Sequence, residues 1–146
     1  MGRFIVFLLL SFGLVGVGVI FDVFENQETV SEAHEAFELI NDIRREVGLP
    51  ILAWDGELEQ LAIKHSRFMK DTKQFEHSDY NLVENILTTT TTVNGIIDLG
   101  IASFPDGKSI VEPWRDSPGH YANIVNNDIR FGAIGVVDNY ATFLAR

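Results

Sequence analysis

Apolar residues recur at spacings of three and four along two stretches of the chain. The first covers roughly 30 to 47, follows a capping-box pattern at 29–32, and is closed by Gly48 and Pro50. The second starts at Asp55, whose carboxylate suits the exposed amides of a helix N-terminus. This periodicity predicts two consecutive amphipathic helices. On the apolar face of the second helix, His65 is expected to be a packed, hydrogen-bonded core residue.

The pattern changes to alternation near the C-terminus. From Ile129 to Val137 every second residue is apolar or glycine, Asp138-Asn139 gives a turn signal, and a second apolar stretch runs from Tyr140 to Leu144. This predicts a terminal β-hairpin. Because helices come first and strands later without a βαβ rhythm, the fold class is α+β.

The middle of the chain carries weaker signals. The threonine run from 88 to 92 favours extended backbone, since β-branched side chains fit strands better than helices. A capping-box pattern at Ser109–Glu112 predicts a short helix through Trp114, which Pro118-Gly119 should end.

The first 21 residues form a segment of their own. Residues 4–21 are uncharged and mostly apolar, Arg3 precedes them, and acidic residues follow at once. This polarity predicts export of the rest of the chain, with 1–21 acting as a signal anchor or as a cleaved signal peptide. We expect an anchor through residues 4–21, a short acidic linker at 22–29, and one domain at 30–146 on the cell surface or outside the cell.

Charge and cysteine content narrow the function classes. The net charge is −10 and there is no cysteine in the 146 residues. An acidic surface repels a phosphate backbone, so no nucleic-acid partner is expected. Disulfides, thiol nucleophiles and zinc-thiolate sites are excluded, and an exported domain without disulfides fits a bacterial or archaeal envelope.

Candidate chemistry gathers in polar, loop-like settings. His77 and His120 lie in such segments, and Glu84 is flanked by apolar residues that would hold its carboxylate inward. Two imidazoles and one carboxylate match the ligand count of an exchangeable Zn²⁺ or other divalent-metal site. By spacing alone, a hydrogen-bonded polar cluster without a metal is the favoured interpretation. Ser117 with His120 as base is a weaker alternative, because no nucleophile-elbow pattern surrounds the serine.

Several short motifs occur in an order that resembles the CAP superfamily of cysteine-rich secretory, antigen 5 and pathogenesis-related 1 proteins. The similarity is greatest to its cysteine-free prokaryotic branch and covers the chain from about Ala33 onward. The motifs are Ile40–Arg45, Leu49–Asp55, Leu58–Ala62, His65-Ser66 to Met69, His77, Glu84-Asn85-Ile86 and Trp114 to Ile124.

This resemblance implies an α-β-α sandwich with a small antiparallel sheet between helical layers. It also implies a cleft with a tetrad of two histidines and two acids. The matching positions here are His77, Glu84 and His120, with Ser117 where eukaryotic relatives have the second acid.

Three functions remain open at this point. The leading hypothesis is a non-enzymatic, membrane-tethered module whose cleft binds a small ligand, a lipid or a surface protein. The alternative is a metal-assisted hydrolase that uses His77, Glu84 and His120 as ligands. The third is a purely structural surface domain.

Overall fold

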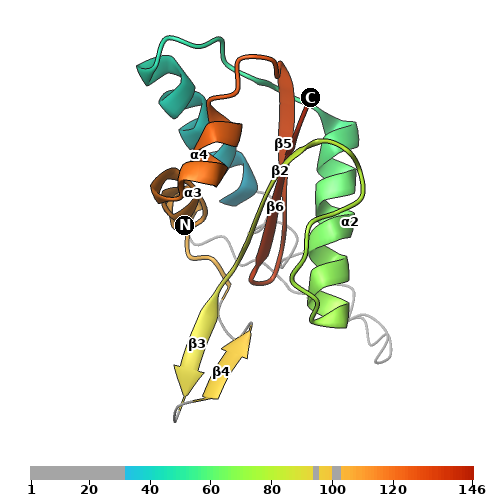
Figure 1. Cartoon of the computed structure of the whole chain (residues 1–146). Helices are drawn as coiled ribbons and strands as arrows, with labels where there is room; N and C mark the ends of the chain where they lie inside the picture. The colour runs from blue at the N-terminus through green and yellow to red at the C-terminus, as the bar shows by residue number, and fades with distance from the viewer. Residues whose placement is uncertain (1–31, 94–95, 100–102) are drawn as a thin grey trace, which may run out of the picture.

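The computed structural model describes residues 32–93, 96–99 and 103–146. A four-stranded sheet stands between two helical layers (Figure 1). Helix α2 (Gly56–Thr72) covers one face of the sheet. On the other face lie the helix formed by residues 32–46, α3 (Gly107–Asp116) and α4 (Pro118–Ile124). The predicted α+β class and its α-β-α layering are confirmed.

The sheet has the strand order β1-β5-β6-β2. Strands β5 (Phe131–Val137) and β6 (Tyr140–Ala145) form the predicted hairpin, with Asp138 at a φ of 52° in the turn. Strand β2 (Val83–Thr88) pairs antiparallel with β6, whereas the short β1 (Ala53–Trp54) runs parallel to β5. Strand β2 is therefore an edge strand of this sheet. The segment between α2 and β2 can contact its outer side, where no strand of the sheet pairs with it.

A separate hairpin continues from β2. Strand β3 (Thr90–Val93) pairs antiparallel with β4 (Ile96–Leu99), and the pair extends away from the three layers (Figure 1). The threonine run is thus extended, as its β-branched residues predict.

The helix boundaries agree with the sequence patterns except around α3. The Asp55 carboxylate accepts hydrogen bonds from the backbone N–H groups of Glu57 and Leu58, at 2.9 and 3.2 Å, as expected of an N-cap. The prediction for α3 was wrong at both ends. Asp106 caps this helix instead of the Ser109 box, and Pro118-Gly119 opens α4 instead of closing α3. Proline fits a first helical turn, because the N–H that it lacks has no partner there.

The two faces of the sheet bury different clusters. On the α2 side, β5 places the small residues Ala133 and Gly135 against the helix, so that the helix backbone comes close to this strand. A Cβ added at Gly135 would lie 2.2 Å from the backbone nitrogen of Ile63, which leaves room for glycine alone. The opposite face holds the larger core, which includes Phe37, Ile40, Ile110, Trp114, Ile124, Ile134 and Phe143.

The predicted anchor at 1–21 and the predicted linker at 22–29 lie outside the described residues. Within the part of the chain that the structure does describe, none of the helices combines the length and the apolar character needed to cross a membrane.

Candidate functional site

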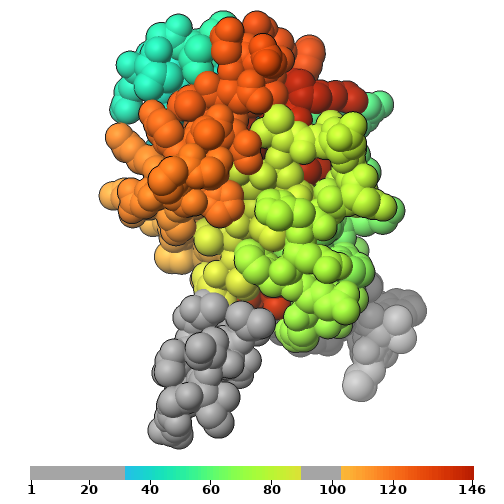
Figure 2. All heavy atoms as spheres, in the orientation of Figure 1, coloured from blue at the N-terminus to red at the C-terminus, as the bar shows by residue number. Residues whose placement is uncertain are grey.

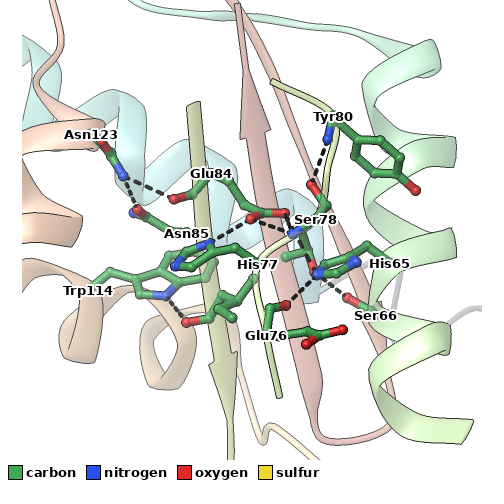
Figure 3. Close-up of polar contacts among 12 residues, drawn as sticks. His65, Ser66, Glu76, His77, Ser78, Tyr80, Glu84, Asn85, Trp114 and Asn123 are labelled. Carbon is green, nitrogen blue, oxygen red and sulfur yellow. Dashed lines mark hydrogen bonds and ion pairs between the residues drawn. The ribbon is translucent and has the colours of Figure 1, made fainter. Parts of the chain in front are cut away.

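A buried carboxylate on edge strand β2 lies at the centre of the polar cluster. Glu84 is 8% exposed, and its Oε2 lies 2.6 Å from Nδ1 of His77 and 3.0 Å from the backbone nitrogen of Ser78 (Figure 3). Both contacts come from the segment that joins α2 to β2. The sequence-predicted pairing of His77 with Glu84 is therefore present in the structure.

This pairing fixes the chemistry of the His77 ring. An ionised carboxylate only accepts hydrogen bonds, so in the neutral form of the ring Nδ1 is the donor and Nε2 keeps its lone pair. The His77 side chain is 61% exposed, while that of Glu84 is 7% exposed. The arrangement presents a basic nitrogen at the surface in a defined orientation, and a buried acid holds it there.

His65 is a member of this cluster that the sequence analysis did not assign to it. The residue is buried on α2, and its Nε2 lies 2.8 Å from the carbonyl oxygen of Glu76 and 3.8 Å from Oε1 of Glu84. The expectation of a packed, hydrogen-bonded histidine is confirmed. Its position also places the Glu84 carboxylate between two imidazoles, as Figure 3 shows. Sequence spacing carries no signal for this proximity.

His120 approaches the same cluster from α4. Burial lowers the pKa of its imidazole, and the nearby His77 lowers it further. The two rings that the sequence placed in one cleft are thus close enough to interact electrostatically. Because its pKa is lowered, His120 is neutral at pH 7 and also offers a ring nitrogen that accepts a hydrogen bond.

Two asparagines hold α4 beside β2. Asn123 donates from Nδ2 to the carbonyl oxygen of Glu84 at 3.0 Å and to Oδ1 of Asn85 at 2.8 Å. Asn85 in turn donates from its Nδ2 to the carbonyl oxygen of His120 at 3.0 Å. In Figure 2 the segment before β2 and the α3–α4 segment accordingly meet on one face of the molecule. These amides position the two histidines relative to each other.

Two large buried side chains, Trp114 and Arg44, tie the elements around this cluster to one another. Trp114 is fully buried on α3 and donates from Nε1 to the carbonyl oxygen of Ile86 at 3.1 Å, which ties α3 to β2. Arg44 is also fully buried, and its Nη1 donates to the carbonyl oxygen of Ile124 at 2.7 Å. The end of α4 is therefore anchored to the helix formed by residues 32–46.

Ser117 stands apart from the other three candidate residues. It separates α3 from α4, is half-buried, and makes no side-chain capping hydrogen bond to α4. Across the described residues, no hydrogen bond joins its hydroxyl to His77, Glu84 or His120. The position matches the tetrad by sequence order, but the contacts of the cluster are made by the other three residues.

The divalent-metal interpretation concerns the same three residues, His77, Glu84 and His120. Among the described residues no three His, Asp or Glu side chains are grouped so as to hold a metal ion. The Glu84 carboxylate is already engaged by His77 and by the Ser78 backbone. The metal site with His77, Glu84 and His120 as ligands stays a prediction, and so does the hydrolase that would depend on it.

Comparison with known proteins identifies the family of the chain. The sequence pattern of the family described as "CAP: Cysteine-rich secretory protein family" matches residues 37–144. The chain belongs to the CAP family. The resemblance that the motifs suggested is therefore confirmed, and the His77, Glu84 and His120 cluster lies inside the matched region of this CAP domain.

The CAP domain is similar to proteins of several bacteria. It is 31% identical over 123 residues to "Uncharacterized membrane protein YlbC" of Bacillus subtilis, covering 79% of this chain and 34% of that protein. An extracellular protein containing an SCP domain from Bacillus anthracis superposes with a TM-score of 0.70 at 26% identity, covering 92% of this chain and 44% of the other. A cysteine-rich secretory protein from Staphylococcus aureus shares the fold, with a TM-score of 0.60 at 15% identity over 80% of this chain and 39% of the other. The present chain thus spans between a third and a half of the length of these relatives.

Proposed function

We propose that this CAP domain is a non-enzymatic binding module at the outer face of the cytoplasmic membrane. Its ligand would be a small molecule, lipid or surface partner that presents hydroxyl or amide donors to His77 and His120. The observation that carries this proposal is the 2.6 Å contact between Glu84 and Nδ1 of His77. It leaves Nε2 of an exposed ring free to accept a hydrogen bond in a fixed direction.

The lowered pKa of His120 supports the same function. A neutral His120 ring near His77 offers a second nitrogen that accepts a hydrogen bond, whereas two charged imidazoles would repel each other. The site has a base and an acid that orients it. However, the described residues place no nucleophile in hydrogen-bond contact with His77. A binding role is the simpler use of this geometry.

The binding proposal is tested by NMR of the full chain in non-ionic detergent, in which the histidine ring signals are followed. The probes are lipid vesicles of phosphatidylglycerol and phosphatidylethanolamine, and soluble peptidoglycan fragments. We expect one class to shift the ring signals of His77 and His120 together. The variant His77→Ala should abolish the response, while His34→Ala, which removes an exposed imidazole stacked on Trp54, should leave it intact. Shifts confined to His34, or no response to any probe, would refute the proposal.

The tether is a separate part of the proposal. The apolar stretch 4–21, with Arg3 before it and acidic residues after it, supports an uncleaved anchor, and two similar proteins are described as membrane and extracellular. In cells that express the full chain, we expect a full-length product that only detergent extracts and that external protease degrades. A soluble product beginning between residues 15 and 30 would show cleavage instead.

A further inference from the structure

A cavity lies next to the proposed site, between α2 and the segment that joins α2 to β2. Its volume is about 380 Å³, and Lys64, His65 and Phe68 of α2 face residues 76–80 across it. Only His77 is shared with the proposed ligand site, because His120 does not line this cavity. Ligand pockets in proteins start at about 300 Å³, so the cavity suits a small organic molecule.

Aromatic rings form much of the wall of this cavity. The His65 ring stacks on Phe68 at a centroid distance of 6.1 Å and meets the Tyr80 ring edge-on at 6.2 Å. Phe68 is 40% exposed although it is a large hydrophobic residue. A phenyl or phenol face carries negative charge density and attracts cations that approach within about 6 Å. Because part of the Phe68 and Tyr80 rings lines the cavity, these rings can also contact a bound cation.

The charged residues that line the cavity also favour a cationic ligand. Glu76 and Asp79 line it, and Lys64 is the one cationic side chain among its lining residues. The buried Glu84 lies directly behind, within 3.8 Å of His65. Burial raises the pKa of Tyr80, and the negative charges of Asp79 and Glu84 raise it further. The whole chain also carries a net charge of −10.

We propose that this cavity binds a small organic cation, namely an ammonium group with a short apolar body. The ring faces and the excess of carboxylates favour a positive group, while the apolar surface suits the methyl or methylene groups attached to it. An anion would meet Glu76 and Asp79 with like charge. A neutral molecule would gain the apolar contact alone, without the electrostatic attraction.

Three compounds of nearly the same shape test this proposal. Choline is the cation, 3,3-dimethylbutan-1-ol is its neutral analogue, and 3,3-dimethylbutanoate is the anion. Each is titrated into the full chain in non-ionic detergent, and the backbone amide signals of residues 76–80 are followed by NMR. We expect choline to bind at least about fivefold more tightly than the alcohol, which corresponds to one cation–π contact. The anion should bind most weakly.

Matched variants locate the effect. Phe68→Ala and Asp79→Asn should each weaken choline binding several-fold, and the alcohol should be insensitive to Asp79→Asn. The controls are Phe131→Ala, which removes another phenylalanine of similar exposure, and Asp128→Asn, which removes another exposed carboxylate. Neither control residue lines the cavity.

Several results would overturn the inference. These are the absence of choline binding, equal affinity for choline and the alcohol, or equal effects of the control and cavity variants. The inference stands apart from the proposed function, because the cavity variants leave His120 and the Asn85–Asn123 contacts in place. A protein that binds choline but no envelope component would refute the proposed function and keep this inference. A protein that binds an envelope component but not choline would refute this inference and keep the proposed function.

Discussion

Replacing Arg44 by methionine should destabilise the protein far more than the same change at the neighbouring Arg45. The Arg44 side chain is fully buried and donates to three backbone carbonyl oxygens, those of Pro50, Ile124 and Asn126, at 2.8, 2.7 and 2.8 Å. Burial lowers the pKa of this guanidinium, and Arg130 adds to the effect. These hydrogen bonds offset only part of the cost of burying the charge, since the pKa stays lowered and the buried Nη2 has no partner among the described residues.

The magnitude follows from these contacts. Hydrogen bonds that involve a charged group contribute about 1.5–3 kcal/mol each, and a buried acceptor left without a donor costs about 1–3 kcal/mol. The Ile124 carbonyl is buried, whereas those of Pro50 and Asn126 are reached by bonds that are only part-buried. Methionine restores apolar packing and removes the cost of burying the charge. The net loss expected for Arg44→Met is about 3 kcal/mol.

Urea unfolding of the full chain in one non-ionic detergent, followed by tryptophan fluorescence, measures this loss. With a slope of about 2 kcal/mol per molar urea, the midpoint should fall by about 1.5 M. Arg45→Met is the matched control, since among the described residues Arg45 forms ion pairs with the exposed Glu38 and Asp42 alone. Surface ion pairs contribute about 0–1 kcal/mol, so its midpoint should move by less than about 0.5 M. Equal midpoints for the two variants would refute the reasoning.

Three further predictions concern packing and protonation. Gly135→Ala should cost about 3 kcal/mol or more, because its Cβ would lie 2.2 Å from a backbone nitrogen of α2. Gly56→Ala, where nothing lies within 4 Å, is its control in the same urea assay. NMR titration should place the pKa of His120 below about 6.5, and His77→Ala should raise it. Because the folded-state pKa is lowered, the unfolded state protonates first, so stability falls as pH drops from about 6.5 towards the folded-state pKa of His120. Although burial opposes ionisation, hydrogen bonds from α2 amides lower the pKa of Asp55, so the stability gap between wild type and Asp55→Asn should shrink as pH falls below about 3.9. A gap that does not depend on pH would contradict this assignment.

Local signals predicted the parts of the fold that depend on local chemistry. The N-cap at Asp55 and the hairpin around Asp138 were found because a capping carboxylate and strict alternation act within a few residues. The start of α4 was missed because Pro118 fits two interpretations, the end of one helix and the first turn of the next. Only the packing of α3 and α4 against β2 distinguishes them, and that contact is remote in sequence.

The candidate site was predictable to the same degree. The pairing of His77 with Glu84 spans seven residues, and the family motifs indicated His120. The proximity of His65 to Glu84 was not predictable, because it depends on how the segment after α2 folds back over that helix. The sequence also gives no signal for side chains that hold the site in place without belonging to it. Arg44, for example, is recognisable there only as a basic residue on a helix.

The alternation of edge strand β2 explains how one short motif serves two neighbouring surfaces. Glu84 lies opposite Leu144, which packs on the α2 side, so the carboxylate faces α2, His65 and the proposed cation cavity. Asn85 lies opposite Phe143 of the other core and holds α4 beside the strand. Because β2 has no neighbouring strand on its outer side, His77 can approach Glu84 from the preceding segment and still come close to His120. A slip of one residue in the pairing of β2 with β6 would exchange the two faces, so both surfaces depend on the same register.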